Sequence, residues 1–261
     1  MLTPDALRAW RKQGYLVLRD HLDAERVAAL RAVVEEIQAW PEAPGRWMHY
    51  FESSPAGDDG RQLCRTENFY PYHGGFAAFL DDPASQELVG ELLDEPAVLF
   101  KEKINYKLPG GAGFVAHQDA PAYTTFAQTH HITLLVPVDA MTSDNGCLEV
   151  VSGRHGEGML PQEADGTLAR SWVESADWRT VGAAPGDVVV LDSYAPHRSG
   201  VNRTARPRRA FYLTFNAASH GDFREAYYAD KRRRFPPECE RGPDGAVGDG
   251  SGVYNLSLIH I

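Results

Sequence analysis

A chain of 261 residues can bury a proper core, and one large domain is expected rather than two. Apolar residues make up 43% and charged residues 24%, and the net charge of −10 disfavours a nucleic-acid partner because phosphate would be repelled. Three widely spaced cysteines, a start without a signal-peptide stretch and the lack of any run long enough to span a membrane favour a cytoplasmic protein without disulfides.

The first forty residues predict two helices that flank a short strand. Thr3 followed by Pro4 is typical of a helix start, and GYLVLRD reads as a strand. From Asp23 to Trp40 apolar residues recur at helical spacing. Residues 41–80 are rich in Pro, Gly, His and aromatic residues without a clear period, so we expect a long loop region that covers another part of the molecule. A further helix, SQELVGELLDE, follows.

From residue 97 the pattern changes to strands and turns. The β-rich segments are AVLFKEKINYKL, FVAHQDAPAY, ITLLVPVDA, CLEVVSG, VVVLDSYAPH and RRAFYLTFN. Strands preceded by helices predict a β-sandwich or open barrel buttressed by N-terminal helices. The basic run KRRR at 231–234 lies beside acidic segments, and we interpret it as a solvated helix end.

The expected organisation is a single domain over residues 1–255. It comprises a helical part over 1–96, a strand-rich core over about 97–220 and a C-terminal extension over 221–255. The final residues 256–261, LSLIHI, resemble a translated sequencing adapter more than a terminal strand.

A His-x-Asp sequence formed by His117 and Asp119 is the first candidate for a metal site. On a strand, residues i and i+2 point to the same face, so the imidazole and the carboxylate can meet at one point. His197, directly after VVVLDSYAP, is the strongest candidate for a third ligand. Two histidines and one carboxylate leave one face of an octahedral iron(II) open for a bidentate co-substrate and dioxygen. Among ten histidines a chance His-x-Asp is common, and a surface loop explains these residues equally well at this point.

Residues that follow His197 favour the metal site. Ser199 stands at +2 and Arg208 at +11, where Arg208 begins the segment RRAFYLTFN. A guanidinium there can bind the distal carboxylate of 2-oxoglutarate bidentately, and the Ser199 hydroxyl can add a hydrogen bond. Arg209 is the alternative, because neighbouring residues of a strand face opposite sides and only one of the two can enter the barrel.

These ordered motifs resemble those of the phytanoyl-CoA dioxygenase family of iron(II)/2-oxoglutarate oxygenases. The chain is similar to that family from about Leu2 to Tyr228, beginning with GYLVLRDHLDAERVAAL. HQD, DNGCLEVVSGRH, PGDVVVLDSYAPHRSGVN and RPRRA then follow in order. The resemblance implies a double-stranded β-helix, a cupin-like jelly roll, with the metal inside one end.

The resemblance also implies roles for single residues. It points to His117, Asp119 and His197 as iron ligands and to Arg208 and Ser199 as contacts of 2-oxoglutarate. Further residues expected to line the co-substrate pocket are Gln118, Lys103, Thr133 and Leu135. Because halide-inserting relatives lack the carboxylate, Asp119 favours hydroxylation over halogenation. We therefore expect a dioxygenase that uses Fe(II), 2-oxoglutarate and O2, hydroxylates a C–H bond and releases succinate and CO2.

The substrate is expected to be a small polar or anionic metabolite. The stretch FKEKINYKLPGGAGFVAHQDAPAY resembles bacterial members that act on such molecules, among them hydroxylases of 2-aminoethylphosphonate. Candidates for contacting an anionic head group are Lys107, Tyr123 and His130. The alternatives are an acyl-CoA hydroxylase of the same family, although no basic patch suits the nucleotide, a zinc-dependent hydrolase or isomerase on the same jelly roll, and a non-catalytic binding protein. The sequence leaves substrate identity and oligomeric state open.

Overall fold

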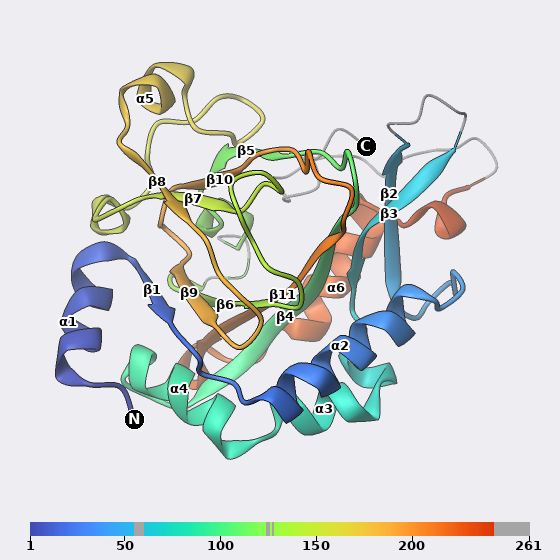
Figure 1. Cartoon of the computed structure of the whole chain (residues 1–261), viewed down its shortest axis with the longest axis horizontal. Coiled ribbons are helices and arrows are strands. Elements are labelled where there is room, and N and C mark those ends of the chain that lie inside the picture. Colours follow the sequence, from blue (N-terminus) through green and yellow to red (C-terminus); the bar gives the residue numbers. More distant parts are fainter. Residues whose placement is uncertain (55–59, 124–125, 127, 243–261) are drawn as a thin grey trace.

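Two antiparallel sheets form the centre of the molecule in the computed structural model, which describes residues 1–54, 60–123, 126 and 128–242 (Figure 1). The larger sheet consists, in spatial order, of β1 (Tyr15–Leu18), β9 (Val188–Asp192), β6 (Ile132–Pro137), β11 (Arg208–Ala217), β4 (Ala97–Lys107), β3 (Arg61–Glu67) and β2 (Met48–Ser53). The smaller sheet consists of β5 (Phe114–His117), β10 (His197–Ser199), β7 (Leu148–Val151) and β8 (Trp178–Val181). The predicted strand-rich core with N-terminal helices is confirmed.

Helices cover the outer face of the larger sheet. They are α1 (Pro4–Gln13), α2 (Ala24–Gln38), α3 (Gly74–Leu80) and α4 (Pro83–Leu93), while α5 (Arg170–Ser175) lies near the smaller sheet and α6 (Arg224–Arg234) follows β11 (Figure 1). As predicted, Thr3 caps α1, because its hydroxyl accepts a hydrogen bond from the N–H of Ala6. Single 3-10 turns span Tyr70–Tyr72, Ala120–Ala122, His155–Glu157, Ala218–His220 and Glu238–Glu240. Over the described part of the chain, every helix is too short or too polar to cross a membrane.

Alternation along the strands separates the two faces of the larger sheet. On the outer face, Leu134 and Val190 join a core to which α2 and α3 contribute Val34 and Phe76. On the inner face, Leu135, Val189 and Leu191 pack with Leu148 and Val150 of the smaller sheet. Burying such a side chain on either face contributes roughly 1.5–3 kcal/mol, so both layers stabilise the sheet. A central strand covered on both sides reads as the unbroken apolar run VVVL at 188–191.

Residues 41–80 differ from the predicted loop region. They contain the hairpin β2–β3, and β3 pairs with β4 so that the hairpin extends the larger sheet. The helical part predicted over 1–96 therefore supplies three strands as well as helices. The period of β3 is hidden because its last four residues, 64–67, are buried on both faces and three of them are polar or charged. Neither an apolar run nor an apolar alternation marks such a strand.

The C-terminal part corrects a second prediction. Lys231, the first residue of the basic run, is buried instead of solvated, and its Nζ lies 2.5 Å from Oε2 of Glu67. The three cysteines are free, as predicted. The tail at 256–261 lies outside the described residues.

Candidate active site

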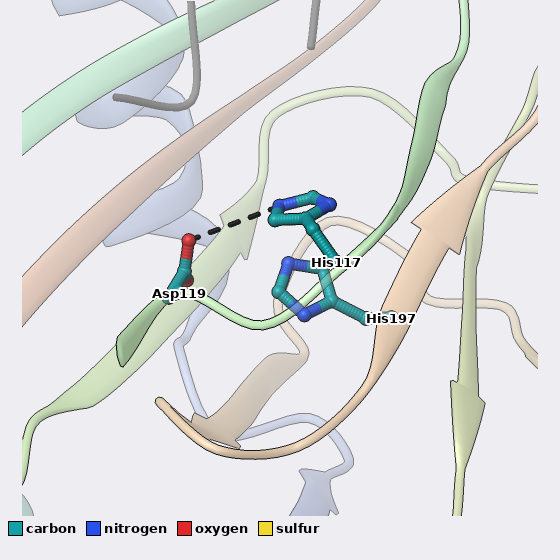
Figure 2. A group of neighbouring side chains, drawn as sticks. All are labelled: His117, Asp119 and His197. Carbon is teal, nitrogen blue, oxygen red and sulfur yellow. Dashed lines mark ion pairs between the residues drawn. The ribbon is translucent and has the colours of Figure 1, made fainter. Parts of the chain in front are cut away.

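Three buried side chains predicted as metal ligands meet where β5 and β10 run side by side (Figure 2). One ligand atom each from His117, Asp119 and His197 lies within 4.8 Å of the other two. His117 ends β5 and His197 begins β10, and the two residues are direct partners in the antiparallel ladder, with ring centroids 4.2 Å apart. Nε2 of His117 lies 3.9 Å from Oδ1 of Asp119. Strand pairing thus brings together residues that are far apart in the sequence.

Asp119 reaches the histidines by a different route from the predicted one. We expected His117 and Asp119 on one strand, but β5 ends at His117 and Asp119 has a helical backbone, with φ −77° and ψ −31°, at the start of the 3-10 turn 120–122. The N–H of Ala120 donates to the carbonyl of Ser193 at 2.9 Å. This bond ties the turn after Asp119 to the segment that leads into His197, which fixes the carboxylate beside the imidazoles.

Both imidazoles are oriented to bind a metal through Nε2. Nδ1 of His117 lies 2.7 Å from the carbonyl oxygen of Val115, and Nδ1 of His197 lies 3.0 Å from that of Ala195. A carbonyl oxygen only accepts hydrogen bonds, so each Nδ1 carries the proton and each Nε2 keeps its lone pair. Two imidazole nitrogens and a carboxylate, with no thiolate, form the donor set that suits iron(II) with open positions.

The protonation states of the three side chains also fit a divalent cation. Burial lowers the pKa of His117 to about 3 and also lowers that of His197. Burial alone would raise the pKa of Asp119, but the cationic side chains around it lower that pKa instead. Neutral imidazoles and an ionised carboxylate are the forms that coordinate metal, so binding at neutral pH requires no proton release from these groups.

The predicted contacts of 2-oxoglutarate lie together beside this triad. Arg208 is 1% exposed, its Nη2 donates to the carbonyl of Gly146 at 2.7 Å, and its buried Nε has no hydrogen-bond partner. Lys107, its partner on β4, donates to Oγ of Ser199 at 2.8 Å. Burial and the charge of Arg208 lower the pKa of Lys107 to about 6. Ser199 lies two residues beyond His197, so a dicarboxylate bound by Arg208 and Ser199 can reach the triad, and its charge would favour the protonated form of Lys107.

Lys107 therefore lies beside Arg208 and Ser199, whereas we expected it to contact the substrate. Arg209 faces the opposite side of β11 from Arg208, as the strand period requires, and its Nε and Nη2 donate to Asp139 at 2.8 and 3.0 Å. The alternative between the two arginines is thereby resolved by the fold in favour of Arg208.

Gln118 was expected to line the co-substrate pocket, but its amide is already satisfied. Its Nε2 donates to the carbonyls of Gly158 and Tyr194 at 2.9 and 2.6 Å, and its Oε1 accepts from the N–H of Leu160 at 2.9 Å. Gln118 thus ties residues 158–160 and Tyr194 to the segment between His117 and Asp119. His130, predicted as a substrate contact, is bound to Oδ2 of Asp192 at 2.8 Å.

Three of the remaining predicted residues, Lys103, Thr133 and Leu135, share the inner face of the larger sheet, and Tyr123 ends the 3-10 turn after Asp119. Cross-strand pairing places Lys103 opposite Tyr212, and Tyr212 opposite Leu135. The hydroxyls of Thr133 and Thr214 lie 2.9 Å apart, so Thr133 is satisfied by its neighbour on β11. Tyr123 is fully buried, and its ring centroid lies 4.5 Å from Nζ of Lys101.

Lys101 is a residue that the sequence did not single out. It is 3% exposed and precedes Lys103 by two residues on β4, so both side chains enter the interior from the same face. The alternation in KEKINYK was the available signal, but a polar strand face usually faces solvent. Burial, as the largest cause, lowers the pKa of both lysines. Arg65 and Glu67 were missed as well, because they lie in the predicted loop region.

Comparison with known proteins gives consistent matches along the chain. The family model described as phytanoyl-CoA dioxygenase (PhyH) matches residues 10–210. A 2-aminoethylphosphonate dioxygenase from an uncultured bacterium is 45% identical and covers 97% of each chain. A methylphosphonate hydroxylase from Gimesia maris is 45% identical over 90% of this chain and 88% of that one. The solved structure of EctD from S. alaskensis with 2-oxoglutarate and 5-hydroxyectoine is 21% identical, with a TM-score of 0.73 over 84% of this chain and 77% of that one, and it supports the fold.

Proposed function

Because the chain belongs to the phytanoyl-CoA dioxygenase family, we propose that it hydroxylates a small phosphonate at the carbon bonded to phosphorus. The predicted family and its class, a dioxygenase dependent on iron(II) and 2-oxoglutarate, are confirmed. In the proposed reaction the C–H bond, dioxygen and 2-oxoglutarate yield a C–OH group, succinate and CO2. The co-substrate supplies the electrons that reduce the second oxygen atom.

One observation carries the substrate proposal: two buried lysines have no acidic partner of their own. Lys101 and Lys103 are 3% and 7% exposed, and neither makes a hydrogen bond or an ion pair with the described residues. Both interact electrostatically with Asp119, so they lie on the side of the triad. A buried ammonium without a counter-ion is costly, which is why burial lowers the pKa of Lys101 and lowers that of Lys103 well below its ordinary value. A doubly charged phosphonate would favour the protonated form of both lysines at once.

The names of two relatives support the same substrate class. One acts on 2-aminoethylphosphonate and the other on methylphosphonate. Every C–H bond of methylphosphonate belongs to the carbon bonded to phosphorus. If the two lysines hold the phosphonate oxygens, that carbon is the nearest one to the triad. This geometry favours the same position of hydroxylation in this chain.

The side chains divide the work between binding, orientation and exclusion of water. His117, Asp119 and His197 would hold the ferrous ion, which when bound supplies the activation of dioxygen for oxidising an unactivated C–H bond. The remaining groups act by position: Arg208, Ser199 and Lys107 would bind the distal carboxylate of 2-oxoglutarate. Phe100, Tyr123 and Tyr227 form a buried aromatic cluster beside Lys101, which keeps water from the phosphonate site.

The test supplies the enzyme with Fe(II), 2-oxoglutarate and one of three compounds: methylphosphonate, 2-aminoethylphosphonate or β-alanine, the carboxylate counterpart of the latter. Phosphorus NMR should show a hydroxylated phosphonate in a one-to-one ratio with succinate, and β-alanine should give far less succinate. Lys103→Met should raise KM for the phosphonate by about 10- to 100-fold, since a charged hydrogen bond is lost. Lys12→Met, a change on the exposed end of α1, is the matched control. Succinate formation with a short acyl-CoA alone, or turnover with zinc and no oxygen, would refute the proposal.

A further inference from the structure

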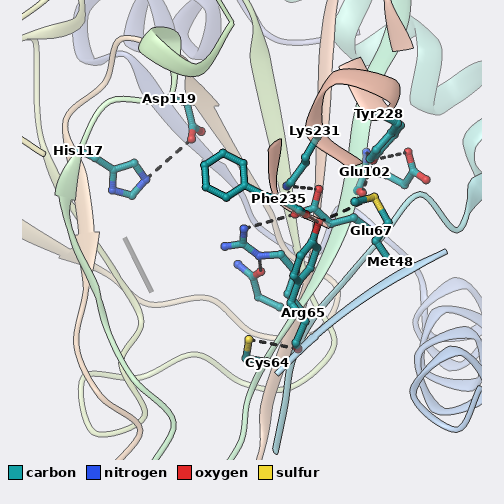
Figure 3. Close-up of polar contacts among 12 residues, drawn as sticks. Met48, Cys64, Arg65, Glu67, Glu102, His117, Asp119, Tyr228, Lys231 and Phe235 are labelled. Atoms are coloured by element: carbon teal, nitrogen blue, oxygen red, sulfur yellow. Dashed lines mark hydrogen bonds and ion pairs between the residues drawn. The ribbon is translucent and has the colours of Figure 1, made fainter. Parts of the chain in front are cut away.

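The guanidinium of Arg65 on β3 is a third cation on the inner face that the assignments above leave unused. It is fully buried, its Nε donates to Oδ1 of Asn105 at 3.1 Å, and its Nη1 donates to Oε1 of Glu67 at 3.3 Å. Its buried Nη2 has no hydrogen-bond partner. Figure 3 shows this side chain extending from β3 toward the side on which His117 and Asp119 lie. Nε and Nη1 of this planar guanidinium thus have acceptors, and Nη2 can donate to an oxygen of a bound ligand.

Glu67 does not neutralise Arg65, because Lys231 already occupies its carboxylate. Nζ of Lys231 lies 2.6 Å from Oε1 and 2.5 Å from Oε2 of Glu67 (Figure 3). Burial would raise the pKa of Glu67, but Lys231 and Arg65 lower it to about 2, so the carboxylate is ionised. Burial lowers the pKa of Lys231 to about 7, while the carboxylate of Glu67 favours its protonated form. With Lys231 protonated, one negative and two positive groups, each at most 2% exposed, leave one positive charge uncompensated. The shorter and doubled contact assigns Glu67 to Lys231 and leaves that charge on Arg65.

Lys231 reaches Glu67 from α6, and α6 is itself fastened to β4. Nη2 of Arg224 lies 2.7 Å from Oε1 of Glu102, and the hydroxyl of Tyr228 donates to the carbonyl of Glu102 at 2.8 Å. One turn before Lys231, the ring of Tyr227 lies 5.6 Å from Nζ of Lys101. The C-terminal helix therefore stands at a fixed place beside the inner face, and its lysine holds Glu67 in a fixed orientation.

We propose that Arg65 binds an oxygen of the substrate's phosphonate group through Nη2, and that Lys231 is the positioning residue that keeps Arg65 free to do so. Without Lys231, both oxygens of Glu67 would turn to Arg65 and form a bidentate pair that neutralises it. With Lys231 in place, Arg65, Lys101 and Lys103 offer donors from two neighbouring strands, which suits three tetrahedrally arranged oxygens better than the two coplanar oxygens of a carboxylate. This inference rests on the proposed function and makes Arg65 its specificity residue.

Equilibrium binding of methylphosphonate to the anaerobic enzyme with Fe(II) and 2-oxoglutarate tests the inference by calorimetry. Lys231→Met should weaken phosphonate binding by about 10- to 100-fold, the loss expected when a charged hydrogen bond is removed. The dissociation constant for 2-oxoglutarate should change by less than about twofold, because Lys231 lies far along the inner face from Arg208. Arg233→Met is the matched control, since Arg233 is on the same helix with its side chain 67% exposed. Lys231→Arg keeps the cation and should restore binding.

A second variant covers the case in which Lys231→Met does not fold. Arg65→Lys keeps the charge but removes the planar fork, so it should weaken methylphosphonate more than β-alanine, and kcat at saturating phosphonate should fall much less than kcat/KM. The inference is overturned if wild type does not bind methylphosphonate, or if a folded Arg65→Lys or Lys231→Met variant binds it as wild type does. Wild type that binds methylphosphonate in this way without hydroxylating it would contradict the proposed function and leave the inference standing.

Discussion

Replacing Arg208 by lysine tests the co-substrate site, and its neighbour Arg209 supplies the control. Nη2 of Arg208 is held by the carbonyl of Gly146 at 2.7 Å, which turns the unpaired Nε toward the place where the distal carboxylate of 2-oxoglutarate would lie. Lysine keeps the charge but offers no fork, so one charged hydrogen bond is lost. Such a bond contributes about 1.5–3 kcal/mol, which corresponds to a rise of about 10- to 100-fold in the dissociation constant for 2-oxoglutarate.

The assay is calorimetric titration of the anaerobic Fe(II) enzyme with 2-oxoglutarate, together with kcat at saturating co-substrate. kcat should stay within about threefold of wild type, because the fork holds the far end of the co-substrate equally in the ground and transition states. Arg209→Lys should leave 2-oxoglutarate binding unchanged and lower the stability by about 1 kcal/mol, since Arg209 donates twice to Asp139 on the outer face. Unchanged affinity in Arg208→Lys, or a larger loss in Arg209→Lys, would refute the assignment of the inner-face arginine.

Three further predictions concern groups around the site. Gln118→Leu should lower the free energy of unfolding, measured in urea, by roughly 1–3 kcal/mol, because one buried and two partly buried backbone groups lose their partner; a loss below about 0.5 kcal/mol would show that these bonds do not hold the loops. The pKa of Glu67 is lowered to about 2, so the stability that Glu67 contributes is present above its unfolded value of 4.5 and is lost as the pH falls toward 2. Glu67→Gln should therefore flatten the melting temperature between pH 5 and 3, and an equally steep fall in the variant would count against the ion pair. Burial raises the pKa of the Cys64 thiol to about 12, so iodoacetamide at pH 8 should label the half-buried Cys239 well before Cys64; equal labelling rates would contradict the burial of Cys64.

The ligand triad and the inward-facing arginine could be predicted from the sequence because the local patterns and the ordered family motifs together single them out. His197 follows one short strand pattern and Arg208 begins the next. The strand period shows that only one of Arg208 and Arg209 can enter the barrel, and the family resemblance points to Arg208. The error over Asp119 has a physical reason as well. A continuous strand, and a strand that ends at His117 before a turn, both let the side chains of His117 and Asp119 converge, so the spacing is compatible with either backbone. The sequence predicts that His117 and Asp119 lie close together, but it does not show whether Asp119 continues the strand or begins a turn.

The residues of the proposed phosphonate site could not be predicted in the same way. Arg65 and Glu67 lie on a strand whose inward polar residues leave no apolar pattern, and their partner Lys231 is 164 positions away from Glu67. A charged residue is usually exposed, so KRRR is interpreted as a solvated helix end until the fold shows what Lys231 faces. Buried charge is a property of the tertiary arrangement, because the group that offsets Glu67 comes from α6 and meets it only in the folded chain.

The two sheets carry different parts of the site, and this separation bears on how the substrate is chosen. The smaller sheet and its loops hold the triad through backbone contacts: a ladder pair between His117 and His197, and a carbonyl behind each ring. These contacts do not depend on which side chains line the larger sheet. The larger sheet presents its cations from neighbouring strands, so a substitution at Arg65 or Lys103 changes the charge that meets the substrate and leaves the ladder intact. In the proposed site, backbone contacts of the smaller sheet thus position the metal ligands, and the inner-face side chains of the larger sheet would choose the substrate.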